Sequence, residues 1–193
     1  VSCGPVSQRG ETIVTRSGLE GGAIYALSPA LREALARQPT ATLVLDLRPD
    51  IEAGALAARL SGGRKGDSRS NMLRKAAQLS AAAIAILRDA TGNDLPADPT
   101  ALSGLIKAVP LTVTGLMALD RAISSAGGVA GHEIDSHFML RKLPGIFVAG
   151  DMLDWDAPTG GYLLQASMAT GFAAGHGAVD YIDGAFAASL HAK

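Results

Sequence analysis

The sequence predicts a mixed α+β chain, in which a β-rich part and a small helical subdomain precede an α/β segment. Three observations support this fold class. Strand-like residues dominate the first 49 positions, apolar residues recur at helical spacing over 50–107, and a short apolar run near 146–149 precedes a glycine-rich turn and a long helix.

The N-terminal part favours β-structure. Val1–Val6 and Glu11–Thr15 predict the two strands of a hairpin over residues 1–17, with Gln8-Arg9-Gly10 as its turn. A glycine-rich connection follows at Gly18–Gly22.

A helix and a strand come next. Ser28 is expected to be the N-cap and Pro29 the first residue of a helix that runs to about Gln38. The run Thr42–Leu47 is rich in branched apolar residues and predicts a strand, which Pro49 ends.

Residues 50–107 are predicted to be mostly helical, because their apolar residues recur at three- and four-residue spacing. The expected helices are Ile51–Leu60, Asn71–Gln78, Ser80–Ala90 and Pro99–Ala108. Six basic residues and the single acid Asp67 fall within Arg59–Lys75. Because no aromatic residue interleaves with these charges, a solvated surface is favoured over a site for phosphate or nucleic acid.

The last third contains short strands and one long helix. Val109–Thr114 predicts a strand that returns after the helices, and Ala122-Ile123 is a short apolar piece. Further elements are the strands Phe138–Leu140 and Ile146–Ala149 around the Leu143-Pro144-Gly145 turn, and a final helix from about Thr159 to Ile182.

The most informative motif is Gly145–Asp151, followed closely by Pro158–Tyr162. An acid after a short strand can accept hydrogen bonds from a sugar or ribityl hydroxyl. A glycine-rich helix start offers free N–H groups and the positive end of the helix dipole. An ordinary strand-turn-helix corner is the alternative, but the closeness of the two parts favours a cofactor site.

The final helix carries two stripes of small residues, each spaced by four. Glycine costs a helix about 1 kcal/mol relative to alanine, so close approach to a sheet or a cofactor is the expected compensation. The stripes are Ser167, Gly171 and Gly175, and Thr170, Ala174 and Ala178.

Composition excludes several classes of protein. The formal net charge of −1 gives no electrostatic case for nucleic acid. Cys3 is the only cysteine, which rules out an internal disulfide and predicts a reducing, cytoplasmic location. The longest apolar run, Ala81–Leu87, is too short for a membrane span. The four histidines show no metal-ligand spacing, so no metal site is expected. The GxGxxG, GxxxxGK[ST] and GxSxG motifs do not occur.

Several segments together resemble one family. They are Gly18–Ser28, Ile123–Val129, Leu143–Asp154 and Pro158–Gln165, of which Gly-Asp-Met-Leu-Asp and Pro-Thr-Gly-Gly-Tyr-Leu-Leu-Gln are the most specific. The chain resembles, over nearly its whole length, the bacterial aminoacetone-oxidase-like flavoproteins, which are NAD(P)/FAD-dependent oxidoreductases.

The resemblance implies a discontinuous FAD domain of the glutathione-reductase kind, interrupted by an insert with a β-barrel-like part and a small helical part. By this resemblance, residues 1–49 and 108–122 form the β-rich insert and 50–107 the helical subdomain. Residues 123–183 form the C-terminal segment of the FAD-binding domain, and 184–193 a tail. The N-terminal segment that carries GxGxxG would be missing. The start at Val1 rather than Met, inside strand-like sequence, adds to the expectation of a fragment.

The resemblance also assigns the FAD-binding residues. Asp151 matches an acid, often Glu, that hydrogen-bonds the ribityl chain, and Gly150 allows close backbone approach there. The helix start near the flavin pyrimidine edge corresponds to Gly160, Gly161 and Tyr162. A loop along the isoalloxazine ring corresponds to Gly127, Gly128 and Val129. No catalytic side chain can be named, because Tyr25 and Tyr162 could face the flavin or simply pack.

Three hypotheses for function follow. In the first, the chain is part of an FAD-dependent oxidoreductase that performs two-electron redox of an unidentified small molecule. The second is a non-catalytic fragment or subunit, active only with the missing GxGxxG segment, so that this chain alone is inactive. The third is a helical module that binds nucleic acid through Arg59–Lys75.

Overall fold

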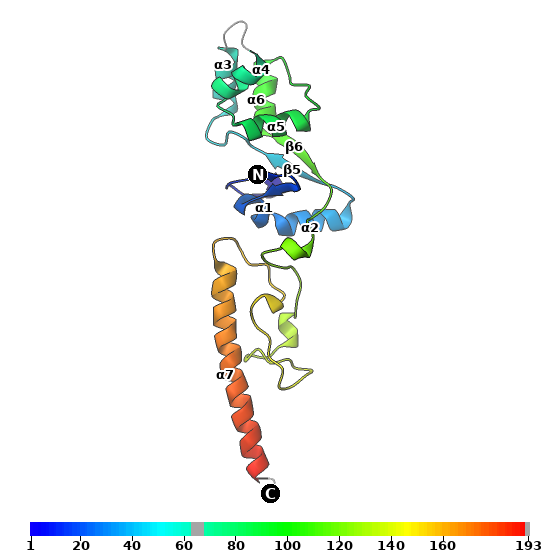
Figure 1. Cartoon of the computed structure of the whole chain (residues 1–193), viewed down its shortest axis with the longest axis vertical. Helices are drawn as coiled ribbons and strands as arrows, with labels where there is room; N and C mark the ends of the chain where they lie inside the picture. Colours follow the sequence, from blue (N-terminus) through cyan, green and yellow to red (C-terminus); the bar gives the residue numbers. More distant parts are fainter. Residues whose placement is uncertain (63–67, 192–193) are drawn as a thin grey trace. The chain divides into compact units, whose positions relative to one another are not determined.

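The computed structural model describes the backbone at residues 1–62 and 68–191, and the side chains of the same residues except 121 and 185–191 (Figure 1). The chain divides into two compact units, Val1–Leu116 and Met117–Lys193. Together they form a mixed α+β chain with antiparallel sheets in the first unit.

The first unit contains a four-stranded antiparallel sheet of order β2-β1-β5-β6. Its long central pair joins β5 (Ala41–Leu45) to β6 (Val109–Val113), with Leu43 opposite Leu111. The edge consists of β1 (Ser2–Cys3) and β2 (Val6–Ser7), and β1 pairs with β5. The helical residues therefore form an insertion between two neighbouring strands.

The N-terminal hairpin prediction is wrong. The strand β1 turns at Gly4-Pro5 and pairs with β2, whereas β3 (Ile13–Thr15) pairs with β4 (Gly18–Glu20) in a separate two-stranded sheet. The expected connection at 18–22 is thus partly a strand. Two short local hairpins replace one longer one because each turn closes within a few residues, which costs little chain entropy.

The N-cap prediction for the first long helix is also wrong. A short helix, α1 (Gly22–Ala26), precedes α2 (Ser28–Arg37), and Leu27 occupies the N-cap of α2. The Ser28 hydroxyl donates to the Ile24 carbonyl oxygen at 3.4 Å instead of accepting from α2. Because α1 ends directly before α2, its Ile24 carbonyl is within reach of the serine, and Ser28 is the first residue of α2 rather than its N-cap.

The described residues of the helical insertion form four helices, which lie beyond β5 and β6 in Figure 1. They are α3 (Ala53–Ser61), α4 (Arg69–Lys75), α5 (Ala81–Ala90) and α6 (Pro99–Lys107), close to the predicted ranges. Side chains of Ser68, Ser80 and Asp98 cap the last three by accepting N–H bonds. Aliphatic residues dominate the shared core, namely Leu43, Leu56, Leu73, Leu87, Leu102, Ile106 and Val109.

Polar contacts fix the insertion to the sheet. Lys107 forms a 2.6 Å ion pair with Asp46 and donates to the Arg48 carbonyl oxygen at 2.8 Å. The Arg48 guanidinium reaches across to the carbonyl oxygens of Ala77 and Gln78. The buried Ser103 hydroxyl of α6 donates to the Ala53 carbonyl oxygen of α3 at 2.6 Å.

The second unit is built on α7 (Tyr162–His191), against which an irregular chain packs. Three 3₁₀ turns interrupt that chain, η1 (Leu119–Arg121), η2 (Gly131–Glu133) and η3 (Gly150–Met152). The helix extends well beyond the predicted end at 182, into the expected tail.

The strands predicted at 138–140 and 146–149 do not form. Only the isolated bridges Ile134–Leu140 and Met139–Phe147 link this region. Asp135 turns the chain back, because its carboxylate accepts N–H bonds from His137 and Met139 at 2.8 and 3.0 Å. The approach to α7 is close, since a Cβ on Gly177 would lie 2.7 Å from that of His137.

The second unit buries little apolar surface of its own. Among its described side chains, Val148 and Ala174 are the buried hydrophobic ones. One face of α7 exposes a row of large apolar side chains spaced by three, four or seven residues, Leu164, Met168, Phe172, Val179 and Ile182. No helix among the described residues is both long and apolar enough to cross a bilayer.

Candidate functional site

The turn η3 is held on α7 by one threonine. The Gly150 N–H donates to Thr170 Oγ1 at 2.9 Å, and the same hydroxyl donates to the Ala166 carbonyl oxygen at 2.7 Å. Gly150 has φ +66°, and a Cβ there would lie 3.2 Å from Ser167 Oγ. Glycine at 150 therefore permits both the backbone conformation and the close seat on the helix.

The loop that contains Gly127, Gly128 and Val129 lies directly along the end of η3. Val129 N–H donates to the Met152 carbonyl oxygen at 2.8 Å, and Asp154 N–H donates to the Val129 carbonyl oxygen at 3.0 Å. A Cβ on Gly128 would lie 2.6 Å from the Met152 carbonyl oxygen. Only glycine fits at 128 without displacing one of the two chains.

Asp151 joins this arrangement through the main chain of the same loop. Its Oδ2 accepts a hydrogen bond from the Ser125 N–H at 3.3 Å. The side chain is exposed. Because a carboxylate has about four acceptor positions, it can still accept from a ligand hydroxyl.

The glycine-rich start of α7 forms the other part of the candidate site. Gly160 and Gly161 have φ +106° and +88°, and Tyr162, which is exposed, begins the helix. Gln165 N–H donates to the Gly161 carbonyl oxygen at 3.1 Å. The first-turn N–H groups before it have no intrahelical acceptor. The loop that contains Gly127–Val129 therefore contacts the turn that carries Gly150 and Asp151, through Met152 and Asp154, whereas Gly160–Tyr162 is connected to them along α7.

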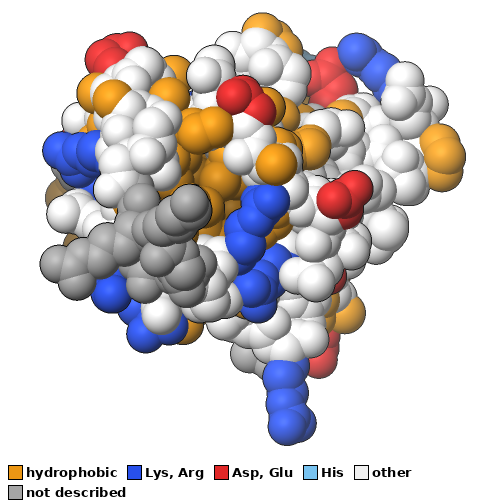
Figure 2. Space-filling model, turned by 90° about the horizontal axis from the view of Figure 1, so that it is seen from above, with side chains coloured by type: hydrophobic (Ala, Val, Ile, Leu, Met, Phe, Trp, Pro, Cys, Tyr) orange, Lys and Arg blue, Asp and Glu red, His pale blue; other side chains and the backbone are white. Residues whose placement is uncertain are grey.

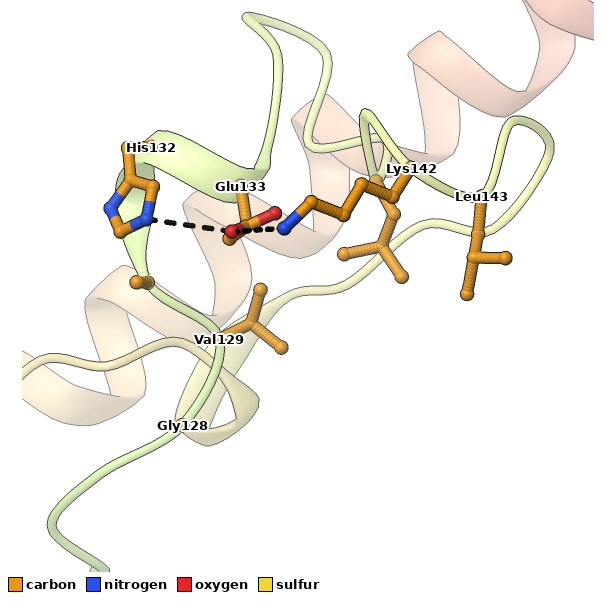
Figure 3. A pocket seen from close by; sticks show the side chains of 8 residues that line it. Gly128, Val129, His132, Glu133, Lys142 and Leu143 are labelled. Carbon is orange, nitrogen blue, oxygen red and sulfur yellow. Dashed lines mark hydrogen bonds and ion pairs between the residues drawn. The ribbon is translucent and has the colours of Figure 1, made fainter.

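A pocket of about 410 Å³ opens on the other side of Gly128 and Val129 (Figure 3). The Glu133 carboxylate lies between two basic side chains there, 2.7 Å from Lys142 Nζ and 3.5 Å from His132 Nε2. The hydrogen bond from Lys142 lowers the pKa of Glu133 below its usual value. The charges at this pocket are thus largely satisfied by one another.

The basic segment Arg59–Lys75 falls in the first unit and is only partly described. Arg64, Lys65 and Asp67 lie outside the described residues. The Arg69 guanidinium donates to the Leu95 and Pro96 carbonyl oxygens, at 3.0 and 2.6 Å, and so joins two segments of the subdomain. Figure 2 shows Lys and Arg side chains scattered among acidic and apolar ones on the face that it draws.

Two contributors were not predicted from the sequence. Ser125 acts through its N–H, which any residue supplies, so the sequence holds no signal for it. Thr170 was noted as part of a small-residue stripe, and its hydroxyl was the available signal. A Cβ at Gly171 or Gly175 would meet nothing within 4 Å, so no described segment of the chain approaches the helix at these two glycines, and the alternative of a cofactor there stays a prediction. Among the described residues, no three His, Cys, Asp or Glu side chains gather as a metal site.

A comparison with protein families places the first unit. A family model described as "HI0933-like protein barrel and H2TH domain" matches residues 1–124, which is more than half of the chain. The match spans the first unit and ends just before Ser125, so the contacts around Asp151 lie beyond it.

Proposed function

The chain belongs to the HI0933-like family, whose proteins are FAD flavoproteins, and we propose that it is part of an FAD-dependent oxidoreductase. The protein would carry out a two-electron redox reaction on an unidentified small molecule. Bound FAD would supply the redox chemistry itself, and the protein would supply binding, orientation and electrostatics.

The observation that carries this proposal is the position of Asp151. Its carboxylate is exposed and accepts from the Ser125 N–H. The turn that carries it is fixed to α7 by the Thr170 hydroxyl and to the 125–129 loop by the main chain of Val129. A fixed, solvent-accessible acceptor suits the recognition of a polyol such as the ribityl chain. These groups therefore fit FAD, with the Asp151 carboxylate as the acceptor for a ribityl hydroxyl and Gly150 as the point of close backbone approach.

The start of α7 would serve the flavin ring. The N–H groups that follow Gly160 and Gly161 point out of the helix without intrahelical acceptors. Together with the helix dipole, they would stabilise negative charge at the pyrimidine edge of the ring, around N1 and O2. Gly127, Gly128 and Val129 would lie along the ring. We assign no proton transfer to a side chain of this chain.

We also propose that this chain needs a further segment, one that carries GxGxxG and binds the ADP half of FAD, and that the chain alone is inactive. The sequence lacks that motif. The uncovered apolar face of α7, with Phe172 at its centre, supports the proposal that another segment completes the second unit. The single buried cysteine, Cys3, agrees with a cytoplasmic location.

The experiment that tests this function starts with the visible spectrum of the purified chain and of its parent protein, after incubation with FAD and desalting. A flavin spectrum in the parent and none in this chain is the expected result. A colourless parent protein would refute the proposal. Retention of FAD by this chain alone would refute only the need for a further segment.

A substitution tests the role of Asp151. We expect Asp151→Ala in the parent protein to weaken FAD binding roughly tenfold, because it removes a hydrogen bond to a charged acceptor that contributes about 1.5 kcal/mol. Asp180→Ala is the matched control, since Asp180 is an exposed acid on α7, ten residues or about 15 Å of helix beyond Thr170. Equal FAD affinity in the two variants would contradict the assigned role.

A further inference from the structure

We infer that Thr170 is a positioning residue for the FAD site, which acts through Asp151 rather than by touching the cofactor. This inference rests on the proposed function. Thr170 is the side chain that connects η3 to α7 by hydrogen bonds, through the 2.9 Å bond from Gly150 N and the 2.7 Å bond to the Ala166 carbonyl oxygen.

The geometry of η3 explains why this one hydroxyl matters. Gly150 is the first residue of the turn and immediately precedes Asp151, so the peptide plane held by Thr170 sets where the carboxylate leaves the chain. The turn closes on itself through Leu153 N–H and the Gly150 carbonyl oxygen at 3.1 Å. A shift at Gly150 therefore moves the entire turn.

Thr170 also determines how the two parts of the site relate. The first turn of α7 begins at Tyr162, eight residues before Thr170, which corresponds to about 12 Å of helix. The turn that carries Asp151 is hydrogen-bonded to the same helix through the Gly150 N–H and Thr170 Oγ1, and Gly150 lies close to Ser167 there. The threonine thus sets the spacing between the acid that would bind the ribityl chain and the N–H groups that would face the flavin ring.

The hydroxyl contributes something that an apolar side chain of the same shape cannot. Thr170→Val keeps the volume and branching but leaves the part-buried Gly150 N–H without its acceptor. We expect η3 to move away from α7 so that this N–H can reach water. Thr170→Ser retains the hydroxyl and should retain the position of the turn.

The test measures the FAD dissociation constant of the full-length parent protein. We expect Thr170→Val to raise it about tenfold and Thr170→Ser to leave it within twofold of the wild-type value. Should the valine variant fail to fold, Thr170→Ala removes the same acceptor without added strain, and the same tenfold increase is expected. Thr91→Val is the matched control, since the Thr91 hydroxyl also donates to a helical carbonyl, that of Leu87 at 3.0 Å, in the first unit.

A double-mutant cycle distinguishes positioning from general stability. If Thr170 acts through Asp151, the pair Asp151→Ala and Thr170→Val should bind FAD no more than twofold more weakly than Asp151→Ala alone. Full additivity of the two effects would overturn the inference. Wild-type affinity in Thr170→Val would overturn it while leaving the proposed function intact. Failure of the wild-type parent to bind FAD would refute both.

Discussion

Gly128 offers the sharpest test of how the second unit is built. A Cβ added there would lie 2.6 Å from the Met152 carbonyl oxygen and 2.8 Å from the Leu153 carbonyl carbon. Both neighbours are main-chain atoms that cannot rotate away. Gly128→Ala should therefore separate the loop from the residues that follow η3 and break the paired hydrogen bonds of Val129.

The expected magnitude has two contributions. The backbone of Gly128 has φ +148°, which costs a non-glycine residue about 1–3 kcal/mol. The steric overlap adds about 1–3 kcal/mol, the usual cost of forcing extra atoms into a packed site. Gly127→Ala separates the two, because Gly127 also has a positive φ, +87°, but a Cβ there would meet nothing within 4 Å.

Chemical denaturation measures the difference. Trp155 is the only tryptophan, and it lies one residue after Asp154, whose N–H bonds the Gly128–Val129 loop, so its fluorescence reports on this region. We expect Gly128→Ala to lose about 1–3 kcal/mol more unfolding free energy than Gly127→Ala. Equal losses in the two variants would refute the close packing on which the candidate site is based.

Two further predictions concern the rest of the second unit. Gly177→Ala should lower the unfolding free energy by about 1–3 kcal/mol, because its Cβ would lie 2.7 Å from that of His137. Gly175→Ala, where a Cβ would meet nothing within 4 Å, should raise the unfolding free energy by up to about 1 kcal/mol, because alanine has the higher helix propensity. Denaturant titration of both variants measures the difference. Hydrogen bonds from the Met139 and His137 N–H groups lower the pKa of Asp135 below 3.8, so the stability that its carboxylate contributes is full above the unfolded-state pKa and is lost as pH falls through the folded value. Asp135→Asn should therefore be less stable at pH 7 but lose less stability between pH 5 and pH 2, and an equal loss in both proteins would contradict this assignment.

The helical insertion was predictable because its signals are local. Apolar spacing located all four helices to within a few residues, and Asp98 before Pro99 marks the start of α6. The strands β5 and β6 were also expected, from their branched apolar runs, although their pairing was not. What the sequence did not indicate is which strands pair at the N-terminus, because β1 and β2 contain only two residues each.

The second unit was harder to predict for a physical reason. The runs around Phe138 and Ile146 have strand composition, but only single bridges form because Asp135 and the turn at Gly145 bend the chain between them. The apolar row on α7 was not singled out either. Apolar residues that remain exposed in a unit look the same in sequence as residues that form its core.

The candidate site could be located from glycine and acid spacing, but not its mode of assembly. Gly127–Val129 and Gly150–Asp151 were both expected at one cofactor, and the structure joins the two segments by hydrogen bonds from Ser125 to Asp151 and from Val129 to Met152. Most of these contacts are made by main-chain N–H and carbonyl groups, which every such residue has and which therefore leave no signal in the sequence. Thr170 and Asp151 are the exceptions, since their side chains take part.

A site assembled from peptide groups has a consequence for variation. The N–H of Ser125, the N–H and carbonyl of Val129 and the main chain at Met152 would be present with almost any side chain. A saturation library of this region should accordingly tolerate wide replacement at 125, 129 and 152, and reject it at Gly128 and Gly150. Proteins that share this arrangement would then vary widely in sequence around two invariant glycines. Their relationship would be recognised from the spacing of those glycines rather than from overall sequence identity.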